Sequence, residues 1–391
     1  MFRSFTFRRG IVLAVPLVAL LAACTPPMPP DVLAARAEAS IDCQQGSTPV
    51  SVPSEFAGTM SAVGDALTSV CPEQSVSEVV SDAAAPVRLV GHAPTSADIE
   101  EFKASACKTG EVISVPAFAY PVTMAYNLPG LEGVVLSPTA VAGILNGTVT
   151  EWSDPLIAQE NPDFSFEGLP PIHLVSASAD QGAVEAMSAW LVQQKVSSWT
   201  SGVTGRLTAG EKVPDDSALV AKLGTAEGSI AVLPIFQAIN NNLAMANLPV
   251  TYVDDSGNER AVVITADDVQ LYKVGSGATS IMIDPARGLL ASPALGGVPV
   301  DGNFDLASSK IVLGQDQPMV GWPVLGYSHL MICNSATDPK PLAFGQYAVR
   351  LAGQGSLEAF GVTPLPEPVR VRTFEPLKVT LNSEDGSSTE N

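Results

Sequence analysis

Residues Tyr126–Asp163 read YNLPGLEGVVLSPTAVAGILNGTVTEWSDPLIAQENPD, a stretch that contains the clearest local signals in the chain. Ser137 followed by Pro138 predicts a helix start, because a serine side chain caps the first free amides and proline fits the first helical turn. Ile144 is placed to lie on the buried face of this helix. Gly147 is placed to end it, since glycine readily adopts the left-handed conformation of a helix C-terminus. We therefore expect a short helix that is packed into a larger body.

Outside this stretch, short apolar strands alternate with helical patterns along most of the chain. Strands are expected at Ser47–Pro53, Ser75–Val80, Val87–Val90, Ile172–Val175 and Ser229–Leu233, and helices at Ala57–Val70, Ser96–Ala106, Ser137–Asn146, Gly182–Gln194 and Pro341–Ala352. Two longer β-rich runs, EVISVPAFAYPVTMAYN at 111–127 and GYSHLMICN at 326–334, lie far apart in the sequence. This alternation predicts an α/β fold, and the two long runs predict two lobes joined by two crossover strands.

The N-terminus indicates export. Three arginines within the first nine residues precede an apolar run, Ile11–Leu20, that is too short for a membrane-spanning helix. An apolar residue and two alanines then precede Cys24, which resembles a bacterial lipoprotein signal. We expect residues 1–23 to be removed and Cys24 to be acylated, which would anchor the exported protein to the outer face of the cell membrane. A plain secretory signal with a chance cysteine is the alternative.

Composition argues against several classes of protein. The formal net charge is −20, with 40 acidic and 20 basic residues, and nucleic acid is an unsuitable partner because its binding requires a basic face. The sequence has no G-x-S-x-G, no H-E-x-x-H and no Gly-rich nucleotide fingerprint, so we do not expect an enzyme or a bound cofactor. It also lacks a CxxC motif, and its three histidines are scattered, so we expect no metal site. The four cysteines other than Cys24 suggest two disulfides in an exported chain, with three pairings open.

The stretch 126–163 resembles the signature region of the phosphate-binding component of bacterial ABC importers, in the order YNLPG, LS, a helix, T-x-W-x-D-P and NP. The segments GTAEGSIAVLPIFQAINNNLAMANL (224–248), WPVLGYSHLMI (322–332) and FGVTPLP (360–366) are similar to later parts of this family. The resemblance implies a type II periplasmic-binding-protein (venus-flytrap) fold that closes around a ligand and presents it to an ABC permease. The domains would be a signal peptide at 1–23, a tether at 24–46, lobe I at 47–125 plus 325–380, lobe II at 126–324 and a disordered tail at 381–391.

The resemblance also implies a ligand set, from which this sequence departs. Family members hold dehydrated phosphate through a Ser-Gly-Thr at a helix N-terminus, with an Arg and an Asp before it and a second Asp in the first lobe. Here Gln181, Gly182 and Ala183 occupy the Ser-Gly-Thr positions, so only the glycine matches. The arginine position falls near Ser176 or Ala177. The helix start itself suggests self-capping instead, because Ser178 and Gln181 have the spacing of a capping box and Asp180 lies in the first turn.

The first-lobe positions differ in the same way. His92 stands where the resemblance places the second Asp, and Glu55 and Phe56 stand where it places a Thr-Phe pair. A histidine in that turn would titrate near neutral pH if it faced a ligand, although an ordinary loop histidine is the simpler interpretation. Glu55 would suit a cationic or hydroxylated ligand. The candidate ligand-binding residues are therefore Glu55, Phe56, His92, Ser178, Asp180, Gln181 and Gly182.

The resemblance further indicates the disulfide pairing. Cys43 and Cys71 flank the first strand and helix, and Cys107 and Cys333 lie beside the two crossover runs. Each pair would meet at the same end of a sheet in this fold, so we predict Cys43–Cys71 and Cys107–Cys333.

The functional hypothesis is an extracytoplasmic, lipid-anchored solute-binding protein for an ABC permease. The family resemblance implies that its ligand is phosphate, whereas the residues at the ligand positions suggest a different small molecule. The alternative is a cell-envelope lipoprotein that uses the same scaffold as an interaction module.

Overall fold

The computed structural model describes residues 41–253, 259–264, 322–365, 370 and 372–379. The predicted signal peptide, Cys24, most of the tether and the C-terminal tail lie outside the described residues. Within the described ranges, no helix is both long and apolar enough to cross a membrane.

The main sheet has nine strands in the order β2-β1-β3-β11-β4-β7-β5-β6, with β8 paired to β4. Their bounds are β1 Gly46–Val52, β2 Gln74–Val80, β3 Val87–Val90, β4 Glu111–Tyr126, β5 His173–Ala177, β6 Glu211–Val213, β7 Ser229–Pro234, β8 Ala244–Met245 and β11 Leu325–Asn334. A separate antiparallel pair joins β9, Leu248–Val253, to β10, Glu259–Ile264. The pairs β1–β2 and β1–β3 are parallel, whereas β11 is antiparallel to β3 and β4.

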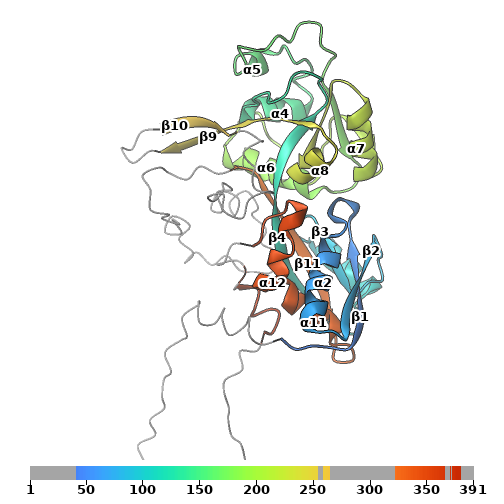
Figure 1. The fold of residues 1–391 in the computed structure, drawn as a ribbon. Helices are drawn as coiled ribbons and strands as arrows, with labels where there is room; N and C mark the ends of the chain where they lie inside the picture. Colours follow the sequence, from blue (N-terminus) through green and yellow to red (C-terminus); the bar gives the residue numbers. More distant parts are fainter. Residues whose placement is uncertain (1–40, 254–258, 265–321, 366–369, 371, 380–391) are drawn as a thin grey trace, which may run out of the picture.

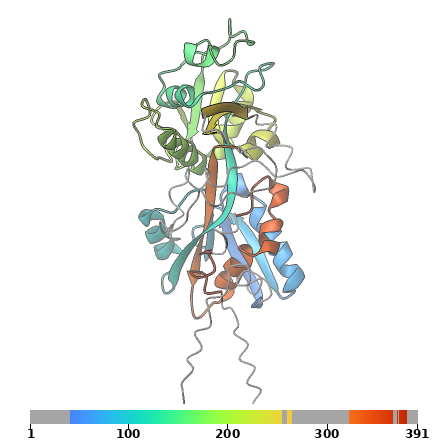
Figure 2. The same cartoon turned by 90° about the vertical axis from the view of Figure 1, so that its left-hand side faces the viewer.

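Helices cover the sheet in both halves of the molecule (Figures 1 and 2). They are η1 Ser54–Phe56, α2 Thr59–Val70, α3 Ser96–Ser105, α4 Pro138–Asn146, α5 Pro155–Ala158, α6 Gly182–Gln193, α7 Asp216–Thr225, α8 Ile235–Asn240, α11 Lys340–Ala348, α12 Leu351–Gly355 and η3 Glu358–Phe360. The helix predicted at 341–352 is in fact two helices, because Arg350 adopts an extended conformation (φ −77°, ψ 160°) between them. The other strands and helices predicted from the sequence are present, with small shifts at their ends.

Two lobes share the long strand β4, which changes its partner along its length. Residues 111–121 pair with β11, and residues 122–126 pair with β7. Pro121 lies at the end of the pairing with β11, and Pro116 lies opposite the register shift in β11. Proline has no N–H to donate, so it is tolerated where a ladder shifts or ends. Figure 1 shows β4 passing from the lower lobe to the upper one, and the two-lobed α/β fold predicted from the sequence is confirmed.

The signature stretch folds as its local signals predict. Ser137 is the N-cap of α4, and its Oγ accepts a hydrogen bond from the Ala140 amide. Gly147 ends the helix with a φ of 74°. Trp152 is buried and packs against Tyr126, with their ring centroids 5.4 Å apart. The segment that follows α4 therefore packs against Tyr126, the last residue of β4.

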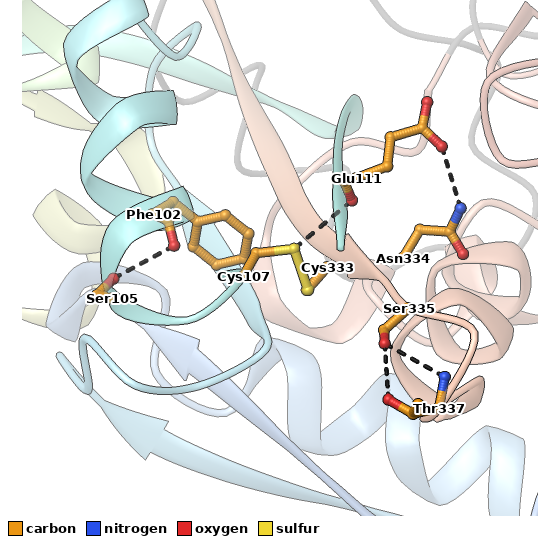
Figure 3. The surroundings of a disulfide bond; sticks show 8 residues. All are labelled: Phe102, Ser105, Cys107, Glu111, Cys333, Asn334, Ser335 and Thr337. Atoms are coloured by element: carbon orange, nitrogen blue, oxygen red, sulfur yellow. Dashed lines mark hydrogen bonds between the residues drawn. A yellow bond between two sulfur atoms is a disulfide. The ribbon is translucent and has the colours of Figure 1, made fainter. Parts of the chain in front are cut away.

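Both predicted disulfides are confirmed. Cys43 is bonded to Cys71, which links the segment before β1 to the end of α2. Cys107 is bonded to Cys333, which links the end of α3 to β11. Figure 3 shows the second bond beside the Phe102 ring, and the two sulfurs belong to a small buried apolar cluster. Cys107–Cys333 therefore ties the outer helix α3 to a crossover strand.

Candidate functional site

The two lobes touch where β3 ends and α6 begins. Gly91 follows β3, and Gly182 is the first residue of α6. A Cβ atom on Gly182 would lie 1.7 Å from the Gly91 carbonyl oxygen and 2.4 Å from the Tyr120 hydroxyl, so only glycine fits at this position. Tyr120 donates a hydrogen bond to the same Gly91 carbonyl. The small cavity between Gly91, Gly182 and Tyr327 has no room for a water molecule.

The helix α6 is not self-capped as the sequence suggested. Its N-cap is Gln181, whose side chain makes no capping hydrogen bond. The Ser178 hydroxyl instead donates to the Val213 carbonyl at 3.0 Å. Asp180 forms an exposed two-point ion pair with Arg206, at 2.7 and 3.0 Å. The prediction of a capping box was therefore wrong, because these side chains find partners outside the helix.

Gln181 acts as a connector within the upper lobe. Its Oε1 accepts a hydrogen bond from the Ala177 amide at 3.0 Å, and its Nε2 donates to Asp216 Oδ1 at 2.8 Å. Gln181 is buried, with 7% of its surface exposed. The hydrogen bond from the Gln181 amide thus orients the carboxyl of Asp216, the first residue of α7, at the lobe junction.

Asp216 meets Glu55 across the junction. Glu55 lies in η1 of the lower lobe and interacts with the Asp216 carboxyl of the upper lobe. Burial and the nearby Asp216 charge raise the pKa of Glu55 to about 8. The Glu55 carboxyl is therefore largely protonated at neutral pH, and the two carboxyl groups can share a proton.

Further acidic side chains lie beside the contact between Gly91 and Gly182. His92 of the lower lobe approaches Asp98 Oδ2 at 3.3 Å, and Asp98 also caps α3 through Thr95. Glu185, on α6 of the upper lobe, lies near both; burial raises its pKa, while His92 has the opposite effect. The predicted candidate His92 is thus at the lobe junction, in a network with carboxylates of both lobes.

Phe56 is buried in an aromatic cluster that spans the lobes. Its ring centroid lies 5.3 Å from that of Phe118, 5.1 Å from that of Tyr120 and 5.8 Å from that of Phe236. Phe236 belongs to α8 of the upper lobe. The structure therefore brings Glu55, Phe56, His92, Gln181 and Gly182 to the lobe junction, whereas Ser178 and Asp180 lie at its exposed margin.

Two adjoining pockets open beside the Glu55–Asp216 pair. One, of about 590 Å³, is lined by Ser54 together with residues of α7 and α8. The other, of about 280 Å³, is lined by residues of η1, α8 and the segment around Phe360. They share Ser54, Gln237 and Asn241. The sequence analysis missed Asp216 and Gln237, although Asp215-Asp216 stands before an apolar periodic run and was available as a helix-start signal.

In the described part of the site, metal ligands are not clustered and cationic groups do not line the two pockets. Among the described residues, no group of three or more His, Cys, Asp or Glu is placed to hold a metal ion. The described linings of the two pockets contain no lysine or arginine. Chemically, the described linings of these two pockets offer carboxyl, amide and hydroxyl groups, and the nearby Arg206 guanidinium is paired with Asp180 at the margin of the junction.

Comparisons with known proteins agree with this architecture. A family model described as a PBP superfamily domain matches residues 73–290, which is more than half of the chain, and the chain therefore belongs to this superfamily. Phosphate-binding protein PstS 3 of Mycobacterium tuberculosis is 24% identical over 267 residues, covering 66% of this chain and 64% of the relative. PstS 2 of the same organism is 25% identical over 266 residues, with the same coverage. The matched region thus spans just under two thirds of these relatives.

Solved structures show the same fold. A DING protein superposes with a TM-score of 0.54 at 17% identity, covering 84% of this chain and 94% of that one. A high-affinity periplasmic phosphate-binding protein, PfluDING, solved with bound phosphate, gives a TM-score of 0.52 at 17% identity, with 84% and 93% coverage. At these identities the likeness concerns the fold.

Proposed function

We propose that this protein is an exported, lipid-anchored solute-binding protein that holds a small ligand between its two lobes and delivers it to an ABC permease. The supporting observation is that residues of both lobes line the same two pockets: Ser54 and Phe360 come from the lower lobe, and Ser217 and Gln237 from the upper one. A ligand bound there would contact both lobes and stabilise their closed arrangement. Membership of the PBP superfamily and the phosphate-binding relatives support the same function.

Phosphate is the ligand that the relatives suggest, but the charges at the junction favour another solute. Phosphate-binding sites are rich in N–H and O–H donors and commonly include an arginine, which can bind two phosphate oxygens at once. Here the junction carries the carboxyl groups of Glu55, Asp216 and Glu185, and no described lysine or arginine lines either pocket to offset the charge of those that are ionised. We therefore favour a small ligand other than phosphate.

Titration calorimetry on the full-length protein in detergent tests this function. Phosphate, sulfate, sugars, amino acids and cell-wall fragments would be added in turn, and small-angle X-ray scattering would report lobe closure. Binding of one solute with a decrease in the radius of gyration is the expected result. If no solute binds and the lobes do not move, the protein is better explained as an envelope interaction module, a role that the direct contact between Gly91 and Gly182 would also permit.

Export and anchoring are tested in cells. The protein should label with a radioactive fatty acid and fractionate with the membrane. The substitution Cys24→Ala should abolish both. Labelling that persists in this variant would contradict acylation at Cys24.

A further inference from the structure

Three pockets meet at Asn241, the residue that follows α8. Two of them are the pockets beside Glu55 and Asp216, which residues of both lobes line. The third, of about 590 Å³, belongs to the upper lobe and is lined by β8 and by the segments that follow β4 and α8. Asn241 lines all three pockets, so together they form one groove, here called the junction groove. Its pockets have the size of sites for organic ligands.

The exposed polar side chains of the junction groove offer donors and acceptors together. Within the described residues, the hydroxyls of Ser54 and Ser217 and the side-chain amide of Asn240 make no hydrogen bond. Asn241 keeps its side-chain oxygen as an acceptor, because its nitrogen donates to the Gln237 carbonyl at 2.9 Å. A hydroxyl or an amide group can donate one hydrogen bond and accept another. The lining therefore suits a ligand whose own groups both donate and accept.

The charges of the junction groove do not require a charged ligand. Among the described residues, no lysine or arginine lines any of its three pockets, so an anion would meet no cation there. Burial raises the pKa of Glu55 to about 8, so its carboxyl is largely protonated at neutral pH and can donate as well as accept. One Asp216 oxygen already accepts the Gln181 amide at 2.8 Å. An uncharged polar ligand is therefore the best match.

The smaller pocket also has an aromatic wall. Phe56, Phe236 and Phe360 line it, and Phe360 is the one whose side chain is partly exposed. The Phe360 ring packs over Gly58, where a Cβ atom would lie 2.8 Å from the ring, so the ring is held in place. An aromatic ring can cover the C–H face of a sugar ring while nearby polar side chains bind the sugar hydroxyls. A phenyl ring beside hydroxyl, amide and carboxyl groups is thus suited to a carbohydrate.

We propose that the junction groove binds an uncharged sugar of two or more rings, with one ring against Phe360 and its hydroxyls in contact with Ser54, Ser217 and Asn241. This inference rests on the proposed solute-binding function and names its ligand class. Each sugar hydroxyl has one donor and two acceptor lone pairs, which matches this lining. The second ring extends past Asn241 into the third pocket, where the exposed side chain of Asn242 is available.

Calorimetry at pH 7 on the full-length protein tests this ligand class, in a detergent without a sugar head group. The probes are glucose, mannose and galactose with their disaccharides and tetrasaccharides. Glucosamine and glucuronate present the same ring with a positive or a negative charge, and phosphate is the inorganic anion. At least one neutral disaccharide should bind about tenfold or more tightly than its monosaccharide and than any of the charged probes.

Substitutions in the junction groove locate the site. Asn241→Ala and Phe360→Leu should each weaken disaccharide binding about fivefold or more. Asn242→Gly should weaken binding of the disaccharide but not of the monosaccharide, and glycine suits the φ of 53° at this position. Gln159→Ala is the matched control, because Gln159 is an exposed amide of the upper lobe outside all three pockets, and it should leave every affinity unchanged.

The outcomes separate this inference from the proposed function. If a charged probe binds and closes the lobes while every neutral sugar fails, the ligand class is wrong and the solute-binding function stands. If nothing binds, both are wrong. If a sugar binds but Asn241→Ala and Phe360→Leu both keep full affinity, its site lies elsewhere and the inference is overturned; circular dichroism confirms that the variants are folded. Equal affinity for a disaccharide and its monosaccharide would refute the two-ring length.

Discussion

The pKa of Glu55 makes the stability of the protein depend on pH, and Glu55→Gln should remove that dependence. The carboxyl titrates near pH 8 in the folded protein and near 4.5 in an unfolded chain. Below pH 4.5 it is protonated in both states and has no effect. Between pH 4.5 and 8 the unfolded chain loses its proton while the folded protein keeps it, so the free energy of unfolding falls as pH rises.

The size of this effect follows from the same two values. Each unit of difference between the two pKa values is worth about 1.36 kcal/mol. The free energy of unfolding should therefore fall by about 5 kcal/mol from pH 4.5 to 8, and by about 3 kcal/mol of this between pH 5 and 7.5. Water reaches part of the Glu55 side chain and screens the interaction, so we expect roughly half of the latter figure, about 1.5 kcal/mol. Glu55→Gln, which carries no charge at any pH, should be more stable than the unsubstituted protein at pH 7.5 and similar to it at pH 5.

Urea unfolding followed by circular dichroism at pH 5 and 7.5 measures this difference. Glu100→Gln is the matched control, because Glu100 is exposed on α3. It should lose as much stability with rising pH as the unsubstituted protein does. If Glu55→Gln shows the same loss, Glu55 is not a protonated, buried carboxyl, and the description of the junction is wrong.

Two further predictions concern the lobe contact and the disulfides. Gly182→Ala should separate the lobes and increase the radius of gyration in X-ray scattering, because its Cβ would lie 1.7 Å from a backbone oxygen. The control Gly355→Ala, whose Cβ meets nothing within 4 Å, should leave the radius of gyration unchanged. If Gly182→Ala also leaves it unchanged, the contact between the lobes is contradicted. Removing the Cys107–Cys333 disulfide by double serine substitution should lower the free energy of unfolding by about 5 kcal/mol, from the loop entropy of a 226-residue separation. Removing Cys43–Cys71, with a separation of 28 residues, should lower it by about 3.5 kcal/mol. Differential scanning calorimetry should therefore show the larger drop in melting temperature for the first, and the reverse order would refute the entropic estimate.

Much of the fold was predictable because its signals are local. The cap at Ser137, the helix end at Gly147 and the alternation of strands and helices each depend on neighbouring residues, and the structure has them where the sequence places them. The disulfide pairing was predictable only through the family resemblance, since the cysteines of one pair are 226 residues apart. The helix at 341–352 was predicted as one because nothing in its apolar pattern reveals the extended backbone at Arg350.

The site was less predictable because its residues meet only in the folded protein. Gln181 looked like part of a capping box, but its amide is engaged by Ala177 and Asp216, which are brought to it by β5 and α7. The importance of Asp216 depends on its approach to Glu55 from the opposite lobe, and no local pattern encodes this. Likewise, that Gln237 has a free acceptor is a property of packing. The sequence did single out Glu55, which lies at the lobe junction, and its role in ligand binding stays a prediction.

A crystal structure grown with phosphate and with the solute that binds best in calorimetry is the most direct measurement of the central claim, that the lobe junction is a site for a small solute other than phosphate. We predict that this solute lies between the lobes and contacts residues of both pockets, while phosphate does not. Phosphate enclosed between the lobes would contradict the claim.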